Sequence, residues 1–123
     1  MSSARHKTIS VPYELAVSQV KDYAIFMMDP DGRAASWNEG VREVLGWDEA
    51  EWLGQPIEAI FPPEAVAAGE HRKELETAAE TGRANDDRWQ VKRDGTRFFA
   101  QGMTTATRDE RGALVGFMKV MRA

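Results

Sequence analysis

Cysteine is absent from this chain of 123 residues. Its absence excludes disulfides, thiolate nucleophiles, cysteine-ligated metals and every chromophore attached through sulfur. Histidine is scarce as well, because only His6 and His71 are present. Two histidines do not make a zinc site without carboxylate ligands at a suitable spacing, and the sequence does not offer that spacing. We therefore expect no metal site.

Residue pairs suited to acid–base catalysis are also few. The carboxylate pairs stand at expected turns or strand entrances, where aspartate is favoured for local hydrogen bonding. These pairs are Asp29/Asp31, Asp86/Asp87 and Asp109/Glu110. With turn chemistry as the simpler explanation of each pair, we expect a protein that is not an enzyme.

Long apolar runs and a dominant charge are missing too. No run approaches the roughly 20 residues of a membrane-spanning helix, and the opening residues MSSARHKTIS lack the apolar centre of a signal peptide. A cytoplasmic location without direct membrane contact is expected. The net charge is −4 with both signs interspersed. Because no basic stripe lies beside exposed aromatic residues, we expect no nucleic-acid partner.

The residues that are present suit one domain. The chain is 42% hydrophobic and contains four Trp and five Phe, which is enough to bury a single core. Residues 1–11 are small and polar and are expected to form a flexible tail. Residues 12–22 are expected to form a flanking helix, since Pro12 suits a first helical turn and apolar residues follow at near-helical spacing. Residues 23–122 would form the core.

The first part of this core predicts a hairpin followed by helices. The runs AIFMMD (24–29) and RAASW (33–37) flank the turn PDG, which is typical of two paired strands. Asn38 can cap a short helix that follows. The longest helical segment is 64–81, with Gly69 as an interruption and Gly82 as its end.

In the last third of the chain the spacing of apolar residues changes from a helical to an extended pattern. DRWQVKRDGTRFFAQGMTTATRD contains two extended runs around an Asp-Gly turn, and ALVGFMKVM is a third extended run. Three antiparallel strands are expected here. Two strands, a helical middle and three strands together predict an α+β fold with one antiparallel sheet and its helices on one face.

Four blocks of sequence resemble a PAS domain. They are VKDYAIFMMDPDGRAASWNEGVREVLGW, EAEWLGQPIEAIFPPE, RWQVKRDGTRFFAQG and GALVGFMKVMR, and they span about residues 15–122 in the order that this family uses. The chain is similar in particular to PAS modules of bacterial sensor histidine kinases and related multidomain receptors. The resemblance implies a five-stranded antiparallel sheet that cups a small pocket under short helices. It also implies an output domain outside this chain.

The resemblance implies a ligand pocket inside the sheet. Its walls would be Phe26, Trp37, Val41 and Leu45. The alternative is that these side chains simply fill the core. By comparison with flavin-binding relatives, cofactor-contacting positions fall at Gln90, Ala100 and Met121, of which only Gln90 is polar. The flavin photoadduct is excluded because it needs a cysteine, and a non-covalent flavin would lack two of three hydrogen-bonding partners.

His71 is a candidate haem ligand. Oxygen-sensing PAS domains hold iron through a histidine on the helix before the last three strands, which is where His71 lies. On a helical wheel His71 shares the apolar stripe with Leu75 and Ala78. If Gly69 restarts the helix, His71 instead lies in a first turn among charged residues, where a half-exposed histidine has no special role.

One face of the expected strand pair is strongly apolar. Alternation places Trp89, Val91, Phe99 and Met103 on this face, whereas Arg88, Gln90, Ala100 and Gly102 share the other. A second copy of the domain could cover the apolar face and form a homodimer. The alternative is that residues 12–22 cover it within one chain.

These observations lead to three hypotheses. The first is a non-catalytic sensory and dimerisation module of a two-component signalling protein, which senses a small ligand or relays a signal through the strand 113–121 to an output domain such as a histidine kinase. The second is a ligand-free interaction module. The third is a haem-based oxygen or redox sensor that uses His71.

Overall fold

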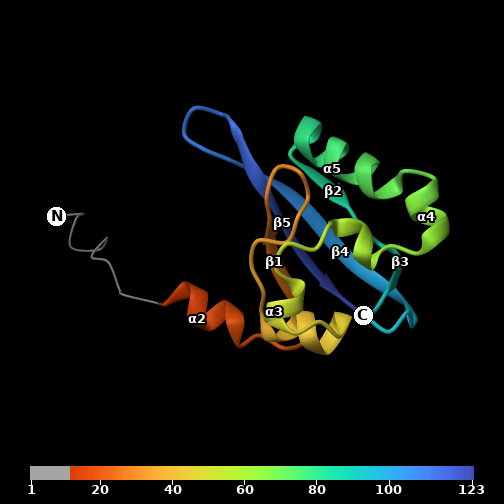
Figure 1. Ribbon diagram of the computed structural model, residues 1–123. Helices are drawn as coiled ribbons and strands as arrows, with labels where there is room; N and C mark the ends of the chain where they lie inside the picture. The colour runs from red at the N-terminus through yellow and green to blue at the C-terminus, as the bar shows by residue number, and fades with distance from the viewer. Residues whose placement is uncertain (1–11) are drawn as a thin grey trace.

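The computed structural model describes residues 12–123, so the tail expected at residues 1–11 lies outside the described residues. Five strands form one antiparallel sheet. Four of them lie in the order β1-β5-β4-β2, and the remaining strand, β3, pairs with the first part of β4. The strands are β1 (Ala24–Met28), β2 (Arg83–Asn85), β3 (Arg88–Val91), β4 (Arg97–Arg108) and β5 (Leu114–Arg122). The α+β fold expected from the sequence is confirmed (Figure 1).

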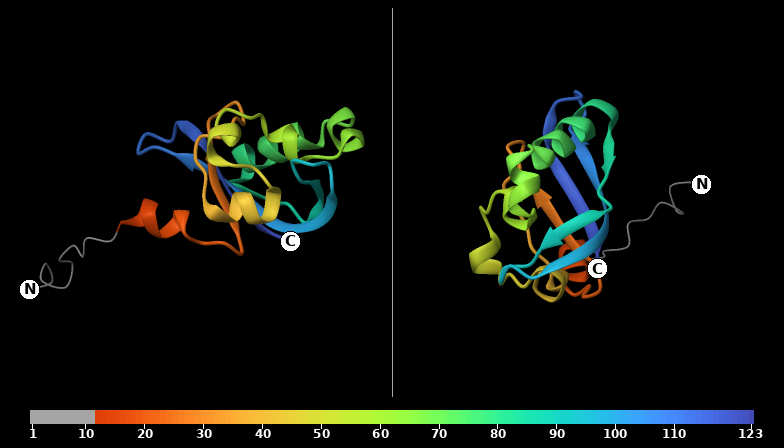
Figure 2. Two further views of the ribbon diagram at one scale, coloured as in Figure 1. Left: turned by 60° about the horizontal axis from the view of Figure 1, so that its bottom comes forward. Right: turned by 90° about the vertical axis from the view of Figure 1, so that its right-hand side faces the viewer.

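Short helices lie between β1 and β2 and cover one face of the sheet (Figures 1 and 2). They are the π-helical turn Val41–Leu45, α3 (Glu49–Trp52), the 3-10 turn Ile57–Ile60, α4 (Pro63–Ala67) and α5 (Glu70–Thr81). The predicted helix 64–81 is split at Gly69, as its sequence indicates. Gly69 has φ +73° and Gly82 has φ +100°, a left-handed conformation that glycine adopts without steric cost.

The segment 33–37 is not the second strand that its sequence predicts. It makes one isolated bridge from Ala34 to Met28 and another from Arg33 to Pro56. Side chains take the place of a regular ladder, because Ser36 Oγ accepts a 2.7 Å hydrogen bond from the Met27 N–H. The fifth strand of the sheet is β2 instead.

Strand alternation builds the core between sheet and helices. In β1 the inward residues Ala24, Phe26 and Met28 are buried while the residues between them are partly exposed. The ring of Phe26 meets Trp52 edge to face at 4.9 Å, and the indole N–H of Trp52 donates to the Ser36 carbonyl at 3.0 Å. Burial of two large aromatic side chains on opposite layers holds α3 against β1.

Asn38 joins three segments of the fold. Its Oδ1 accepts hydrogen bonds from the backbone N–H groups of Ile25 (3.0 Å) and Val41 (3.1 Å). Its amide N–H groups donate to backbone carbonyls at 3.0 to 3.2 Å, those of Val17, Val20 and Tyr23. Asn38 therefore caps the following turn, as predicted, and also ties the end of the N-terminal helix to β1.

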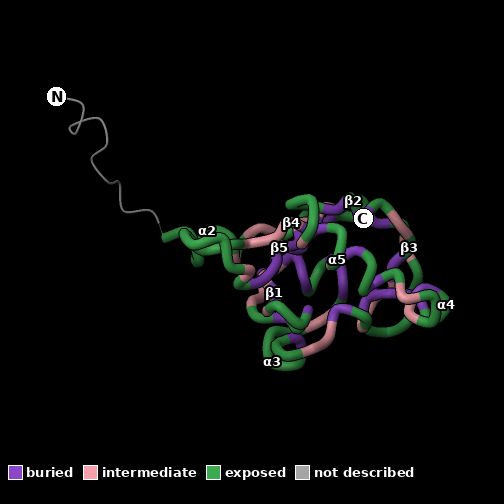
Figure 3. Tube along the Cα trace, turned by 90° about the horizontal axis from the view of Figure 1, so that it is seen from above, coloured by how far each residue is buried: buried purple, intermediate pink, exposed green. Residues whose placement is uncertain are grey.

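The N-terminal helix stands apart from the core. It is α2 (Tyr13–Ser18), shorter than the predicted range 12–22, and none of its residues is buried. The helix extends away from the sheet edge and is exposed along its length (Figures 1 and 3). Across residues 12–123 the structure contains no helix with the length and apolar character needed to cross a membrane.

Candidate functional site

A cluster of polar side chains fills the space between α5 and the sheet. The helix contributes Glu74, the connection between β2 and β3 contributes Asp86, and the inward faces of three strands contribute Gln90, Thr104 and Lys119. All five are buried, and Lys119 and Asp86 are 0% exposed. Charged residues are rarely buried to this extent unless they are paired. The cluster is therefore the most unusual site in the described chain.

Lys119 lies at the centre of this cluster. Its Nζ is 2.8 Å from Glu74 Oε2 and also contacts Asp86 Oδ2. The Thr104 hydroxyl donates to the same Glu74 oxygen at 2.7 Å. Lys119 points inward because it follows Phe117 at a spacing of two in β5, and it lies directly across the sheet from Thr104. The register of the sheet thus delivers a cation to the interior.

Asp86 connects the cluster to the protein surface. Its carboxylate accepts hydrogen bonds from Gln90 Nε2 at 3.1 Å and from Arg88 Nε at 2.6 Å. Arg88 is partly exposed, and its other guanidinium nitrogen lies 2.6 Å from the Glu70 carboxylate. A chain of charged contacts therefore runs from Lys119 outward to Glu70.

The pKa values of the two carboxyl groups shift in opposite directions. Burial raises the pKa of Asp86 to about 7. The positive charge of Lys119 opposes this rise, and the neighbouring Glu74 adds to it. Burial would also raise the pKa of Glu74, but the charge of Lys119 and hydrogen bonds from Asp86, Lys119 and Thr104 outweigh it, so this pKa falls below its ordinary value. When two carboxyl groups share one ammonium group, their pKa values separate in this way, because only one of the two groups can stay charged at low cost.

Two buried oxygen atoms of the cluster have no hydrogen-bond donor among the residues that the structure describes. They are Glu74 Oε1 and Gln90 Oε1. The nearest ionic neighbour of Glu74 Oε1 is Arg88 Nε at 3.5 Å, which is beyond the usual range of an N–H···O bond. Unpaired buried acceptors are uncommon in folded proteins, and both of these oxygens can accept a hydrogen bond from a further donor.

His71 borders the cluster across Phe61. The Phe61 ring lies 6.0 Å from the His71 ring and 5.3 Å from Lys119 Nζ. His71 is 8% exposed, and its Nε2 is 4.0 Å from a Glu58 oxygen. Helix α5 therefore turns His71 inward, onto the same face as Glu74. The charged groups beyond Phe61 do not fit haem, whose faces require an apolar slot.

A metal site does not emerge from this arrangement. Within residues 12–123, no group of three or more histidine and acidic side chains is placed to hold a metal ion.

The predicted pocket residues divide between the core and the surface. Most of them are fully or nearly fully buried, namely Phe26, Val41, Leu45, Gln90, Ala100 and Met121. Trp37 instead lines a groove on the outer side of the sheet beside α2. Its indole N–H donates to the Trp47 carbonyl at 2.8 Å. Trp52 takes the interior aromatic position against Phe26.

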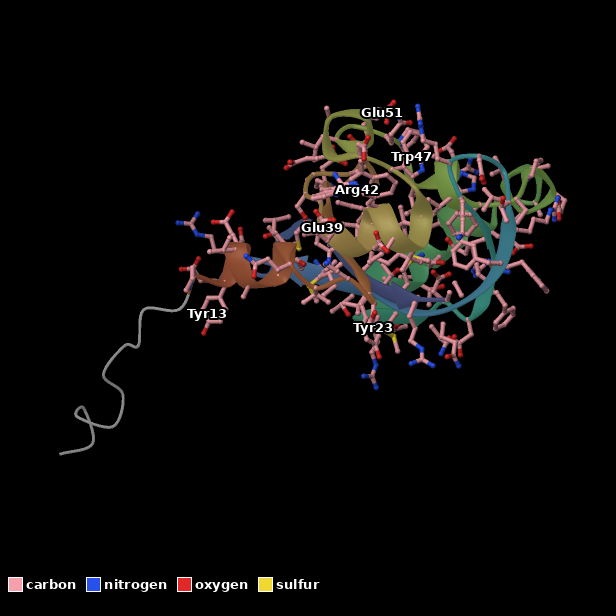
Figure 4. The ribbon with its side chains drawn as sticks, turned by 90° about the horizontal axis from the view of Figure 1, so that it is seen from below. Tyr13, Tyr23, Glu39, Arg42, Trp47 and Glu51 are labelled. Atoms are coloured by element: carbon pink, nitrogen blue, oxygen red, sulfur yellow. The ribbon has the colours of Figure 1, made fainter. Side chains whose placement is uncertain are left out.

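Ion pairs connect the side chains on the surface beside Trp37. The guanidinium group of Arg42 pairs with Glu39 at 2.6 Å and with Asp48 at 2.9 Å, and it lies 4.8 Å from the Trp37 ring centre. Figure 4 shows Arg42 beside Glu39, with Trp47 and Glu51 further along the same side of the molecule. These exposed pairs fasten the turn that follows β1, and each contributes little to stability by itself.

The predicted apolar face of the sheet is exposed. Trp89 pairs with Phe99 across β3 and β4, and the two rings meet edge to face at 5.7 Å. Trp89 is 57% exposed and Phe99 is 47% exposed, while Val91 and Met103 on the same face are partly buried. Helix α2 does not shield these two aromatic rings.

Sequence reasoning missed the central groups of the cluster. Glu74 is one of several charged residues of α5 and does not stand out from them, and turn chemistry explains the pair Asp86/Asp87 equally well. The signal that could have revealed them lies in β5, where Lys119 interrupts the alternating inward series of Phe117 and Met121. A lysine at an inward strand position requires a buried counter-charge.

Comparisons with known proteins agree with this fold. A model of the family described as PAS fold matches residues 16–123. Two-component system protein A of Emericella nidulans is 36% identical over 118 residues, which make up 96% of this chain and 17% of that protein. The chain thus corresponds to a small part of its curated relative.

Two solved structures share the fold at lower identity. The PAS domain of a protein from Colwellia psychrerythraea has a TM-score of 0.79 at 21% identity, covering 89% of this chain and 92% of that chain. A domain of a sensory box sensor histidine kinase/response regulator from Geobacter sulfurreducens has a TM-score of 0.72 at 17% identity, covering 90% and 91%. With the family model matched from residue 16 to the last residue, the protein belongs to the PAS fold family and is related to two-component system proteins.

Proposed function

We propose that this chain is the non-catalytic sensory module of a two-component signalling protein. Its buried polar cluster responds to the signal, and β5 carries the response to an output domain such as a histidine kinase. The relationship to a two-component system protein supports this role. The expected cytoplasmic location, without direct contact to membrane or nucleic acid, remains a prediction from the sequence.

One observation carries the proposal. Lys119 belongs to the last strand of the sheet, yet its ammonium group is bound by Glu74 of the helical layer and by Asp86 of the β2–β3 connection. A change of charge at either carboxyl group therefore alters the force on β5 directly. The apolar walls expected for a ligand, Phe26, Val41 and Leu45, are packed into the core, so the polar cluster is the stronger candidate for receiving a signal.

A fusion to a histidine kinase tests this role. The full chain is joined ahead of the dimerisation and catalytic segments of a histidine kinase, and autophosphorylation is measured for the parent fusion and for Lys119→Met. Allosteric coupling in proteins typically amounts to a factor of at least about 5, so we expect a change of this size. Lys73→Met, on the exposed face of α5, is the matched control.

Circular dichroism and thermal unfolding establish that each fusion is folded. If folded Lys119→Met and Lys73→Met fusions phosphorylate at the parent rate, the cluster does not control output and the proposed role is wrong.

The second candidate function is homodimerisation through the outer face of the sheet. The exposed, edge-to-face pair of Trp89 and Phe99 favours it, because aromatic side chains are enriched at protein interfaces. This function is compatible with the first, because the exposed aromatic pair and the buried cluster use different residues.

A further inference from the structure

The buried cluster contains more negative than positive charge at its centre. Glu74 and Asp86 converge on one ammonium group, that of Lys119, and all three groups are 3% exposed or less. Arg88 adds positive charge at the edge of the cluster, but it also pairs with Glu70 at the surface. A second carboxylate in so dry a site is unfavourable unless it is neutralised.

The hydrogen-bond pattern of the cluster lacks a donor. Lys119, Thr104, Gln90 and Arg88 donate to oxygens of the two carboxyl groups. Two buried acceptors, Glu74 Oε1 and Gln90 Oε1, still receive no hydrogen from any residue within 12–123. A carboxyl group that gains a proton becomes a donor as well as an acceptor. One added proton therefore supplies a donor for one of these two acceptors and removes the excess charge.

We propose that the Glu74–Asp86 pair is a proton switch, in which uptake of one proton from water changes how Lys119 holds β5 and so makes acidity a stimulus of this module. The inference rests on the proposed function, because the change in β5 becomes a signal only if β5 controls an output. With both carboxylates charged, Lys119 is shared between α5 and the β2–β3 connection. With one proton bound, it pairs chiefly with the carboxylate that remains.

The charge environment supports a switch near neutral pH. Burial raises the pKa of Asp86 to about 7, so the pair would change charge within the range of cellular pH. The ionisable groups that face the pair are Glu70 and His71 on α5, Arg88 on β3 and Lys119 on β5. His71 lies on the other side of Phe61 from Lys119, so the experiment must separate its contribution.

Nuclear magnetic resonance of the full chain tests the switch. Side-chain carboxyl carbons and the backbone amides of β5 are followed from pH 5 to pH 9. We expect one carboxyl carbon of the pair to titrate near pH 7, with the amides beside Lys119 shifting at the same midpoint. In Asp86→Asn, which resembles the protonated form, these amides should stay near their acid positions at every pH.

Two matched variants identify the source of the transition. Asp31→Asn changes an exposed aspartate and should leave the β5 transition intact. His71→Gln removes the imidazole and should also leave it intact. If the β5 transition disappears in His71→Gln but persists in Asp86→Asn, histidine titration explains it and the proton switch is wrong.

Other outcomes are equally decisive. The switch is excluded if both carboxyl carbons of the wild-type chain keep constant shifts between pH 5 and pH 9, a result that needs no variant to fold. It is also excluded if one titrates while the β5 amides do not move. Glu74→Gln provides a second variant if Asp86→Asn does not fold. A pH-dependent β5 in the isolated chain, combined with a fusion kinase that ignores Lys119→Met, would instead contradict the proposed function alone.

Discussion

At the scale of single residues, Lys119 is the side chain that compensates the negative charge buried in the interior. Its ammonium group is 0% exposed and is held by Glu74 and Asp86. Buried ion pairs add little net stability compared with apolar residues of the same volume, because desolvation of the charges offsets their attraction. Removal of one partner is a different matter, since the other charges then remain buried without compensation.

Replacing Lys119 by methionine should therefore destabilise the protein. We expect Lys119→Met to lower the free energy of unfolding by about 3–5 kcal/mol at pH 7.5, and by less at pH 5.5, where the carboxyl groups can protonate. Urea unfolding at the two pH values measures both effects. Lys73→Met on α5 should change stability only slightly, and an equal loss in the two variants would contradict the prediction.

The stability of the protein should also depend on pH through Asp86. In the unfolded chain Asp86 ionises near its ordinary pKa of 3.8, whereas burial keeps its proton to about pH 7 in the folded protein. Between these values the folded state binds more protons, so this group's contribution is full below pH 4 and is lost as the pH rises to 7.

The comparison with Asp86→Asn isolates this contribution. Relative to the variant, the wild-type protein should lose at most about 1.4 kcal/mol of stability per pH unit between pH 4 and pH 7, and the difference should be level above pH 8. Chemical unfolding at unit intervals of pH measures it. A difference that is constant from pH 4 to pH 8 would show that Asp86 titrates alike in both states.

At the scale of elements, Asn38 determines how α2 and β1 meet. It accepts from two backbone N–H groups and donates to three carbonyls, the latter at the end of α2 and just before β1. Because α2 buries none of its own residues, these hydrogen bonds are a main source of its attachment. The helix is thus linked to the core through one amide side chain.

Truncation of this side chain should loosen the helix. Asn38→Ala leaves the Ile25 N–H without its acceptor and removes the donors to the three carbonyls, which we expect to cost roughly 1–3 kcal/mol. Hydrogen exchange should show lower protection of the amides of α2. Asn85→Ala, at the exposed end of β2, is the control, and protection of α2 that is unchanged in Asn38→Ala would refute the attachment.

The elements differ in how well the sequence predicts them. The break at Gly69 and the strands of the last third follow from local signals, since glycine conformation and strand alternation act within a few residues. The segment 33–37 does not become a strand, because Ser36 and Asn38 offer side-chain acceptors to β1. Such competition for hydrogen bonds depends on tertiary neighbours. For the same reason the sequence does not reveal the pairing of Glu74 with Asp86, because Lys119, distant from both in sequence, helps to bring them together.

At the scale of the whole molecule, the two faces of the sheet differ in role. The inner face carries the helices and the polar cluster, while the outer face leaves Trp89 and Phe99 exposed in edge-to-face contact. Strand alternation alone assigns both rings to this face, because the two residues stand opposite each other in β3 and β4.

Charge placed on the outer face should prevent association. If the domain is a homodimer through this surface, Trp89→Arg should shift sedimentation velocity from dimer to monomer, since a buried unpaired guanidinium strongly disfavours the interface. Leu53→Arg alters an exposed apolar residue elsewhere and should leave the dimer intact. A dimer that survives Trp89→Arg would place the interface on another surface.

The buried lysine has a further consequence, for strand pairing during folding. In β5 the inward series contains Phe117, Lys119 and Met121, whereas Met118 and Val120 point outward. A slip of one residue would turn Met118 and Val120 into the core, but it would also turn Phe117 and Met121 toward water and release the lysine from the interior. The apolar area gained and lost is then of similar size, so the apolar residues of β5 discriminate only weakly between the two alignments. The ion pairs of Lys119 with Glu74 and Asp86 form in the native register, so the residue least suited to a hydrophobic interior helps to select that register.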